Sequence, residues 1–223
     1  MKNAAGYSAV SEYLASAMHK IFSFKKISVV PNVVDTNLFY PAEKKPVDAH
    51  FIHISSLNYQ KNPEQILQAV AILLKKIPAC RLTIFGEPVE SLINLAATLQ
   101  IADAVEFKGL CSQEVLREHI QQSAALILYS RFETFGCVII EANATGKPVI
   151  VSDIPVFHEN VLDGITGIFV PLNNPVSLAE AMCAVVEDKY AFDEDVIQNW
   201  VKNQYSFEKV AKQFANFYEE KFP

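Results

Sequence analysis

Two glutamates, Glu133 and Glu141, are the residues whose type and spacing best suit chemistry on a ligand. They follow the apolar run at residues 125–129, which places them at the carboxyl end of an expected strand, where doubly wound sheets bind ligands. A helix is predicted from about residue 135 to 145, and the free N–H groups at its N-terminus can hold a phosphate. Carboxylates accept hydrogen bonds from hydroxyls, so the pair suits a phosphate flanked by sugars. The alternative is that Glu133 only caps the helix and Glu141 is solvated or paired with a basic neighbour.

Other catalytic and cofactor motifs are absent from the sequence. The seven glycines form neither a GxGxxG nor a Walker A pattern, and no GxSxG elbow of a serine hydrolase is present. The five histidines never occur in HxH or HExxH spacing, and the four cysteines form no CxxC pair for zinc or redox chemistry. Residues 193–195 match a DxD metal motif, but acidic residues in the first turn of a helix are the favoured interpretation. We therefore expect neither a cofactor nor a metal site.

The composition is that of a folded protein that meets its ligand locally. Apolar residues make up 51% and charged residues 20% of the 223 residues, which is enough for a buried core and gives no signature of disorder. The formal charge of −6, from 19 basic and 25 acidic residues, disfavours nucleic acid as a partner. No apolar run reaches the ~18 residues that span a bilayer, and the N-terminus lacks a signal-peptide h-region. With scattered cysteines expected as reduced thiols, the chain is predicted to be cytoplasmic.

Short apolar runs alternate with helical patterns and predict the sheet that positions the glutamates. The first helical pattern follows Asn62, a plausible N-cap, and Pro63 at the first helical position. Strand–helix alternation every ~20–30 residues implies an α/β fold with a single Rossmann-like, doubly wound parallel sheet of about six strands. The predicted strands are at residues 51–54, 82–85, 105–107, 125–129, 149–151 and 168–170.

The two ends of the chain depart from this alternation. Residues 4–22 are predicted as a helix, followed by a short strand at residues 27–30. Residues 192–221 are predicted as two polar, aromatic-rich helices with no strand after them. We therefore divide the chain into a Rossmann-like domain at residues 1–191 and C-terminal helices at residues 192–223. A domain that opens and closes with such helices is expected to be half of a larger arrangement.

Residues 133–141 match the E-x7-E motif of the retaining glycosyltransferases of family four, the group 1 glycosyltransferases, which have the GT-B fold. Residues 29–39 resemble the family's V-x-P-N-G-V-D-x-x-x-F block, with Val33 at the Gly position, and residues 55–62 resemble its G-R-L-x-x-x-K-G loop. From about residue 5 to 221, the chain resembles the C-terminal, donor-binding domain of this family. The further matching blocks, in order, are residues 82–86, 105–109, 146–150, 159, 163–164 and 167–171.

The resemblance implies that the full-length protein transfers a sugar, of hexosyl type, from a nucleotide diphosphate sugar to an acceptor hydroxyl with retention of configuration and without a metal. Glu133 and Lys61 are then the catalytic candidates: Glu133 contacts the donor sugar, and Lys61 neutralises the departing diphosphate. Glu141 accepts hydrogen bonds from the ribose. The other donor-binding candidates are the backbone amides of Phe135, Gly136 and Cys137 at the sugar and diphosphate, Gly109 and Leu110 beside the base, and Thr134, Ser56 and Asn58.

Two departures from the family pattern fall at this expected site. Ser56 stands where the family usually has an Arg beside the phosphate-binding Lys61, and Asn58 follows two residues later, so that loop lacks a bidentate cation. Whether Arg131 substitutes for it is open at this point. Thr134 stands where many members have Gly, which narrows the space beside the donor sugar.

The implied partners are a nucleotide diphosphate sugar, an N-terminal acceptor domain of the same protein, and an acceptor sugar or lipid-linked glycan, in polysaccharide biosynthesis. Residues 192–223 are expected to pack back on that N-terminal domain, and the chain alone is expected to be inactive. For the full-length protein, a location at the membrane surface is an alternative to a purely cytoplasmic one. Two other functions stay open: a non-catalytic nucleotide-sugar-binding module, and a GT-B nucleotide-sugar epimerase.

Overall fold

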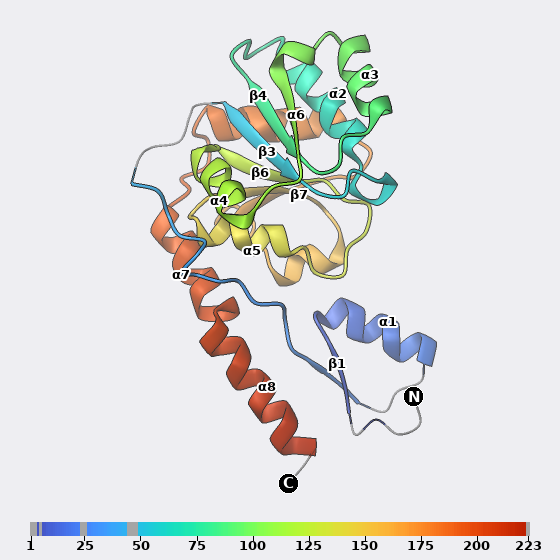
Figure 1. Cartoon of the computed structure of the whole chain (residues 1–223), viewed down its shortest axis with the longest axis vertical. Coiled ribbons are helices and arrows are strands. Elements are labelled where there is room, and N and C mark those ends of the chain that lie inside the picture. Colours follow the sequence, from blue (N-terminus) through green and yellow to red (C-terminus); the bar gives the residue numbers. More distant parts are fainter. Residues whose placement is uncertain (1–3, 5, 23–25, 44–48, 222–223) are drawn as a thin grey trace.

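A parallel six-stranded sheet, in the order β5-β4-β3-β6-β7-β8, forms the centre of the chain (Figure 1). The computed structural model describes residue 4 and residues 6–22, 26–43 and 49–221. The strands are β3 (His50–Ile54), β4 (Arg81–Phe85), β5 (Val105–Gly109), β6 (Ala125–Leu128), β7 (Val149–Ser152) and β8 (Gly167–Val170). The predicted doubly wound sheet of about six strands is confirmed. Its order reverses between β3 and β6, so the loops that follow these two strands leave the sheet side by side.

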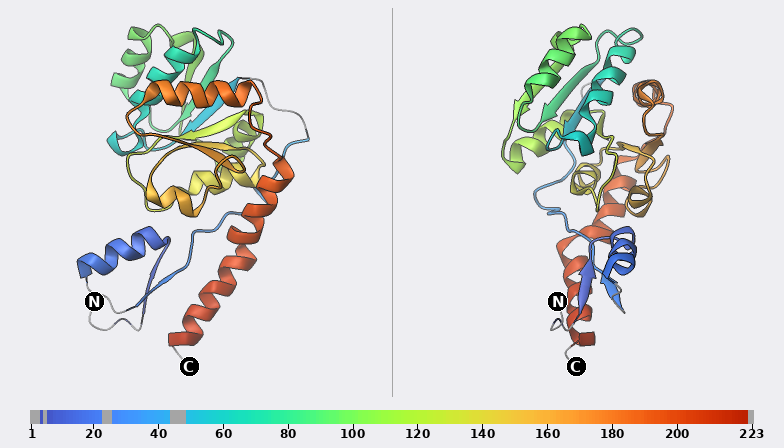
Figure 2. Two further views of the ribbon diagram at one scale, coloured as in Figure 1. Left: turned by 180° about the vertical axis from the view of Figure 1, so that it is seen from behind. Right: turned by 90° about the vertical axis from the view of Figure 1, so that its right-hand side faces the viewer.

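Helices cover both faces of the sheet (Figure 2). One face is covered by α2 (Pro63–Leu73), α3 (Glu90–Thr98) and α6 (Pro175–Val186), and the other by α4 (Gln113–Gln122), α5 (Cys137–Ala144) and α7 (Glu194–Tyr205). Because successive side chains of a strand point to opposite faces, Ala125 and Ile127 of β6 enter one core while Leu126 and Leu128 enter the other. Burial on both faces explains why these strands are continuous apolar runs. Single 3₁₀ turns lie at η1 (Tyr59–Lys61), η2 (Ala102–Ala104) and η3 (Pro155–Glu159).

The N-terminal segment differs from the prediction of one helix over residues 4–22. Residues Tyr7–Ala9 form a strand, β1, and α1 begins only at Glu12 and ends at Phe22. The strand β2 (Ile27–Val29), at the place predicted from the sequence, pairs with β1 in parallel. The helix cannot start earlier because Ser11 caps it, its Oγ accepting the Leu14 amide at 3.1 Å. This β1–α1–β2 unit is a separate two-stranded sheet beside the large one (Figure 1).

The two predicted C-terminal helices are present as α7 and α8 (Phe207–Lys221). The helix α7 packs on the sheet domain, whereas α8 runs away from it alongside the β1–α1–β2 unit (Figure 2). Lys26 and Glu220 form an ion pair of 3.0 Å between that unit and α8. Within the proposed domain ranges, residues 1–3, 5, 23–25, 44–48 and 222–223 lie outside the described residues. No helix in the described part of the chain is both long enough and apolar enough to cross a membrane.

Candidate functional site

A cavity of about 460 Å³ opens at the carboxyl ends of β3 and β6, where the strand order reverses. Its walls come mainly from the β3–α2 loop (residues 55–62), the β6–α5 loop (residues 129–136), the ends of β4 and β5, and the first turn of α5. Nine of the residues predicted for the site line it: Ser56, Lys61, Gly109, Leu110, Glu133, Thr134, Phe135, Gly136 and Cys137. The remaining two, Asn58 and Glu141, are not part of the wall.

The β6–α5 loop is held by its carbonyl oxygens. Four side chains from distant parts of the chain each donate a hydrogen bond to one of them. These bonds run from Ser152 Oγ to Ser130 O (2.5 Å), from Gln60 Nε2 to Phe132 O (2.9 Å), from Ser11 Oγ to Thr134 O (2.7 Å) and from Asn160 Nδ2 to Phe135 O (2.7 Å). Within the described residues, the backbone amides of Phe135 and Gly136 have no hydrogen-bond partner. These four carbonyl oxygens of the loop therefore accept hydrogen bonds from the protein, while the amides of Phe135 and Gly136 can donate to a ligand.

The start of α5 requires a glycine. Gly136 precedes the first helical residue and has φ of +88°, in the left-handed region. A Cβ at this position would lie 3.0 Å from the Phe157 ring and 3.1 Å from Ile139. Because the amides at the N-terminus of a helix have no partners within the helix, this end of α5 can bind an anion in the cavity.

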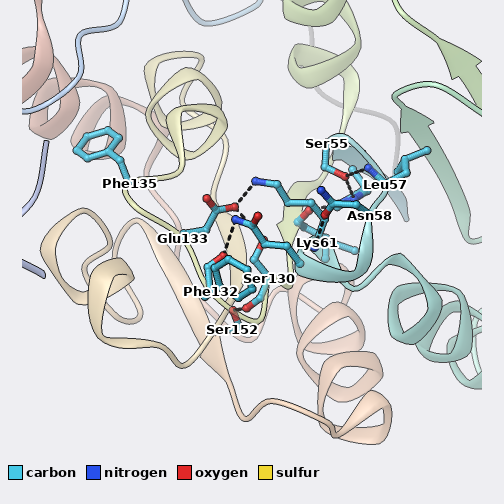
Figure 3. A network of polar contacts seen from close by, with 12 residues as sticks. Ser55, Leu57, Asn58, Lys61, Ser130, Phe132, Glu133, Phe135 and Ser152 are labelled. Carbon is cyan, nitrogen blue, oxygen red and sulfur yellow. Dashed lines mark hydrogen bonds and ion pairs between the residues drawn. The ribbon is translucent and has the colours of Figure 1, made fainter. Parts of the chain in front are cut away.

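Lys61 and Glu133 form an ion pair inside the cavity (Figure 3). Ser130 Oγ donates a second hydrogen bond, of 3.0 Å, to the same oxygen of Glu133. Glu133 is only 7% exposed, and the pair joins the two loops that leave the sheet at the switch point. Asn58 supports it from outside the wall, because its Oδ1 accepts the Lys61 amide at 3.2 Å and caps η1. The arrangement places one cation, one carboxylate and free amides around the same space.

Arg131 does not enter the cavity. Its guanidinium lies 4.1 Å from the centre of the Tyr59 ring and donates to the Tyr59 carbonyl. Lys61 is therefore the only Lys or Arg among the described residues that line the cavity wall. Arg131 therefore does not replace, on the cavity wall, the Arg that the family usually has beside Lys61. It joins the two loops from outside the wall, since its own amide also donates to Gln60 O at 2.8 Å.

A buried histidine shapes the β3–α2 loop. His53 Nδ1 lies 2.8 Å from the Ile127 carbonyl, which can only accept, so Nδ1 carries the proton and Nε2 accepts from Ser55 Oγ at 2.7 Å. Ser55 Oγ in turn accepts the Leu57 amide at 3.0 Å. Burial lowers the pKa of His53 to about 4, so the imidazole is neutral at pH 7. The chain of bonds holds Leu57 at φ of +54°.

Glu141 lies in α5 and is not among the residues that line the cavity. Burial raises its pKa to about 6, and within the described residues its carboxylate makes neither a hydrogen bond nor an ion pair. Cys137, one turn earlier, does line the cavity, and burial together with the nearby Glu141 charge raises the pKa of its thiol. An uncompensated carboxylate at this depth can accept hydrogen bonds from a ligand that reaches it.

The acidic residues of the DxD match at residues 193–195 lie at the start of a helix, as the sequence interpretation favoured. Asp193 caps α7, its Oδ1 accepting the amides of Asp195 and Val196 at 2.9 and 3.1 Å. Glu194 pairs with the buried Lys147 at 2.5 Å. Sequence reasoning missed other cavity residues, among them Asn32, Ser55, Gly86 and Cys111. Asn32 and Ser55 lie in the blocks at residues 29–39 and 55–62 and could have been found there, whereas Cys111 carries no signal in the sequence.

The chain matches the family model described as "Glycosyl transferases group 1" over residues 37–206. It is 32% identical over 184 residues to a D-inositol 3-phosphate glycosyltransferase of Streptomyces avermitilis, covering 73% of this chain and 40% of that protein. It is 29% identical over 170 residues to glycogen synthase of Mycobacterium tuberculosis, covering 74% and 41%. The chain thus spans about two fifths of the length of the curated relatives it matches.

Solved structures share the fold over nearly the whole chain. Anabaena HepE in complex with UDP and glucose matches with a TM-score of 0.89 and 20% identity over 97% of this chain and 64% of that one. Sucrose-phosphate synthase from Thermosynechococcus elongatus matches with a TM-score of 0.86 and 22% identity over 99% and 59%. The sheet with its flanking helices is therefore that of one half of a GT-B protein. From the family match and the sequence relatives together, the chain belongs to the group 1 glycosyl transferases.

Proposed function

We propose that this chain is the donor-binding part of a retaining glycosyltransferase that takes a hexosyl group from a nucleoside diphosphate sugar. The observation that carries the proposal is the Lys61–Glu133 pair placed beside the free amides at the start of α5. These groups match the charge and hydroxyl pattern of such a donor: amides and an ammonium group for the diphosphate, and a carboxylate for the sugar hydroxyls.

In this proposal the chain acts by holding charge where it develops. As the bond between the sugar and the diphosphate breaks, negative charge grows on the leaving phosphate, and Lys61 with the amides of Phe135 and Gly136 stabilises it. Glu133 retains one oxygen without a protein partner in the described structure and accepts hydrogen bonds from the donor sugar. Glu141 accepts from the ribose. An N-terminal domain of the same protein supplies the acceptor sugar or lipid-linked glycan, and no metal takes part.

Binding tests the donor assignment. The 223-residue chain is titrated calorimetrically with UDP, GDP and ADP in EDTA, and we expect heat from at least one of them. UDP is the first probe because the HepE structures with this fold contain UDP or UDP-glucose. If none of the three nucleotides binds, the proposed donor site is wrong.

The division of roles is tested by two matched variants in the full-length protein. Glu141→Ala weakens nucleotide binding, while Glu133→Ala mainly lowers turnover, because a contact to the reacting sugar can strengthen in the transition state. Loss of a hydrogen bond to a charged group corresponds to a change of roughly 10- to 150-fold. The anomeric configuration of the product, read by NMR, tests retention. Equal binding losses with no additional turnover loss for Glu133→Ala contradict the assignment.

A second candidate is a nucleotide-sugar-binding module without catalysis. It is favoured by one observation: Lys61 is the single Lys or Arg on the described cavity wall, and Arg131 is committed to Tyr59. The two candidates separate in one assay of the full-length protein with labelled donor. Donor binding with neither transfer, hydrolysis nor epimerised sugar would support the module.

A further inference from the structure

The N-terminal end of α1 is bonded to the wall of the cavity. Ser11 Oγ donates to the Thr134 carbonyl at 2.7 Å, across 123 sequence positions, and accepts the Leu14 amide at 3.1 Å. The side chain is 1% exposed, so both bonds are shielded from water. One hydroxyl therefore caps α1 and at the same time ties it to the β6–α5 loop.

A second contact holds the same helix end from the other side. The Glu159 carboxylate accepts the Glu12 amide at 2.7 Å and the Tyr13 amide at 2.8 Å. A carboxylate at this position also compensates the positive end of the helix macrodipole. Because these amides have no partner within the helix, Glu159 anchors α1 to η3 of the sheet domain.

The residue after Glu159 reaches the cavity loop itself. Asn160 Nδ2 donates to the Phe135 carbonyl at 2.7 Å, next to the Thr134 carbonyl that Ser11 holds. Tyr205, at the junction of α7 and α8, donates to the Glu159 carbonyl at 3.2 Å and packs its ring edge-to-face on Phe135. The β1–α1–β2 unit and the α7–α8 junction thus converge on the loop that presents the amides of the cavity.

We propose that Ser11 and Glu159 are positioning residues. Through them, the position of the β1–α1–β2 unit relative to the sheet domain controls the conformation of the β6–α5 loop. With the Ser11 bond present, Thr134 is fixed between Glu133 and the free amides of Phe135 and Gly136. Without it, the loop loses one of its four side-chain tethers, and the amides are no longer preformed for an anion. The coupling itself is independent of the ligand; only the choice of UDP as a probe rests on the proposed function.

The test measures the loop and the ligand separately. Ser11→Ala removes both bonds of the hydroxyl, while Ser11→Thr keeps a hydroxyl and should restore them. Ser16→Ala is the matched control, because Ser16 lies exposed on the same helix and makes no hydrogen bond in the described structure. Amide hydrogen exchange is followed in peptides covering residues 131–138 without nucleotide, and UDP affinity is measured by calorimetry.

We expect Ser11→Ala to speed exchange in residues 131–138 and to weaken UDP binding, each by about fivefold, as for the loss of one buried hydrogen bond. Ser11→Thr and Ser16→Ala should behave as the wild type. Glu159→Gln keeps an acceptor oxygen but loses the charge, so its effect has the same direction and is smaller.

Two results would overturn the coupling. If Ser11→Ala speeds exchange in α1 alone and leaves residues 131–138 unchanged, Ser11 is only a helix cap. If Ser11→Thr fails to restore the loop while the folded state is intact, the hydroxyl is not the tether. Faster loop exchange in Ser11→Ala, combined with no UDP binding by the wild-type chain, supports the coupling and contradicts the proposed donor site instead.

Discussion

The two loops that form the candidate site are held in place by different means. The β6–α5 loop is fixed through its carbonyls by side chains that lie far away in the sequence, Ser11, Gln60, Ser152 and Asn160. The β3–α2 loop, besides its contacts with Arg131, is held by bonds to its own neighbours: Ser55 Oγ donates to His53 Nε2 and accepts the Leu57 amide. It also contains two residues with positive φ that are not glycine, Leu57 and Asn62.

The difference shows how the site separates two tasks. In the β6–α5 loop, four carbonyls accept hydrogen bonds from side chains elsewhere in the chain, and only tertiary contacts can provide these bonds. Lys61, which pairs with Glu133, is held by a short, locally capped turn, which η1 and Asn58 provide. The stability of the β6–α5 loop should therefore depend on its backbone geometry. The stability of the β3–α2 loop should depend on the protonation and packing of its buried side chains.

The largest effect is expected for Gly136→Ala in the β6–α5 loop. A methyl group there meets Phe157 and Ile139 at a backbone conformation that disfavours side chains. We expect a loss of about 3 kcal/mol in the free energy of unfolding, measured in urea, and at least about tenfold weaker UDP binding. Gly164→Ala is the control, since Gly164 has φ of +70° but open space around it, and should cost only about 1–2 kcal/mol. Equal losses in both variants would show that the loop tolerates the clash.

The second effect concerns His53 under the β3–α2 loop. Its pKa is about 4 in the folded chain and 6.5 when unperturbed, so acidification from pH 7 to 5 adds a proton to the unfolded chain alone. Between pH 7 and pH 5 the wild type should lose about 2 kcal/mol of unfolding free energy from this group. The loss begins near pH 6.5 and levels off below pH 4, at about 3 kcal/mol in total. His53→Gln should remove this component of the pH dependence.

His19→Gln, at an exposed histidine of α1, is the control for this experiment. Urea unfolding at pH 7 and pH 5 gives one difference in unfolding free energy for each of the three proteins, the wild type and the two variants. A His53→Gln variant with the same loss on acidification as the wild type would mean that the buried imidazole is protonated in the folded chain.

Glu141 in α5 should change the pH dependence of the unfolding free energy in the direction opposite to His53, and by a smaller amount. Burial raises its pKa to about 6 from 4.5, so between pH 7 and 5 the folded chain takes up more of a proton than the unfolded chain. The group therefore contributes about 1 kcal/mol of stability on acidification, which is lost again as the pH rises through 6. Glu141→Gln should make the acid loss steeper, and Glu180→Gln, at an exposed glutamate of α6, should not. A shallower acid loss in Glu141→Gln contradicts the raised pKa.

The contrast between the loops also explains what the sequence could predict. The six strands were identifiable because burial on both faces makes each a continuous apolar run, as at residues 125–129 and 149–151. The strand β1 was not, because its three residues pair with β2 about 20 positions later and adjoin a helical pattern. Lys61 and Glu133 were placed together by the family resemblance rather than by spacing.

The tethers of the β6–α5 loop left no pattern to find. Ser11 and Thr134 are 123 positions apart, and Asn160 and Phe135 are 25 apart, so neither pair has a local spacing that predicts its bond. The local bonds of the β3–α2 loop are similarly invisible in periodicity, but the family block over residues 55–62 includes Ser55 and Leu57. The residues of the β3–α2 loop were thus predictable through the family resemblance. The contacts that hold the β6–α5 loop became visible only in the folded structure.

The smallest effect, and the only stabilising one, is expected for Asn62→Gly at the end of the β3–α2 loop. Asn62 is fully buried, has φ of +56°, and has no partner for either amide atom in the described structure. An unsatisfied buried amide costs about 1–3 kcal/mol, whereas the added backbone freedom of a glycine costs about 0.5–1 kcal/mol. Since glycine adopts this φ without strain, Asn62→Gly should raise the free energy of unfolding by about 1 kcal/mol in urea denaturation. Asn62→Ala removes the same amide but keeps the Cβ at positive φ, so it should gain less than Asn62→Gly. A destabilised glycine variant would mean that the buried amide is satisfied in solution, and that this loop is better ordered than its local bonds suggest.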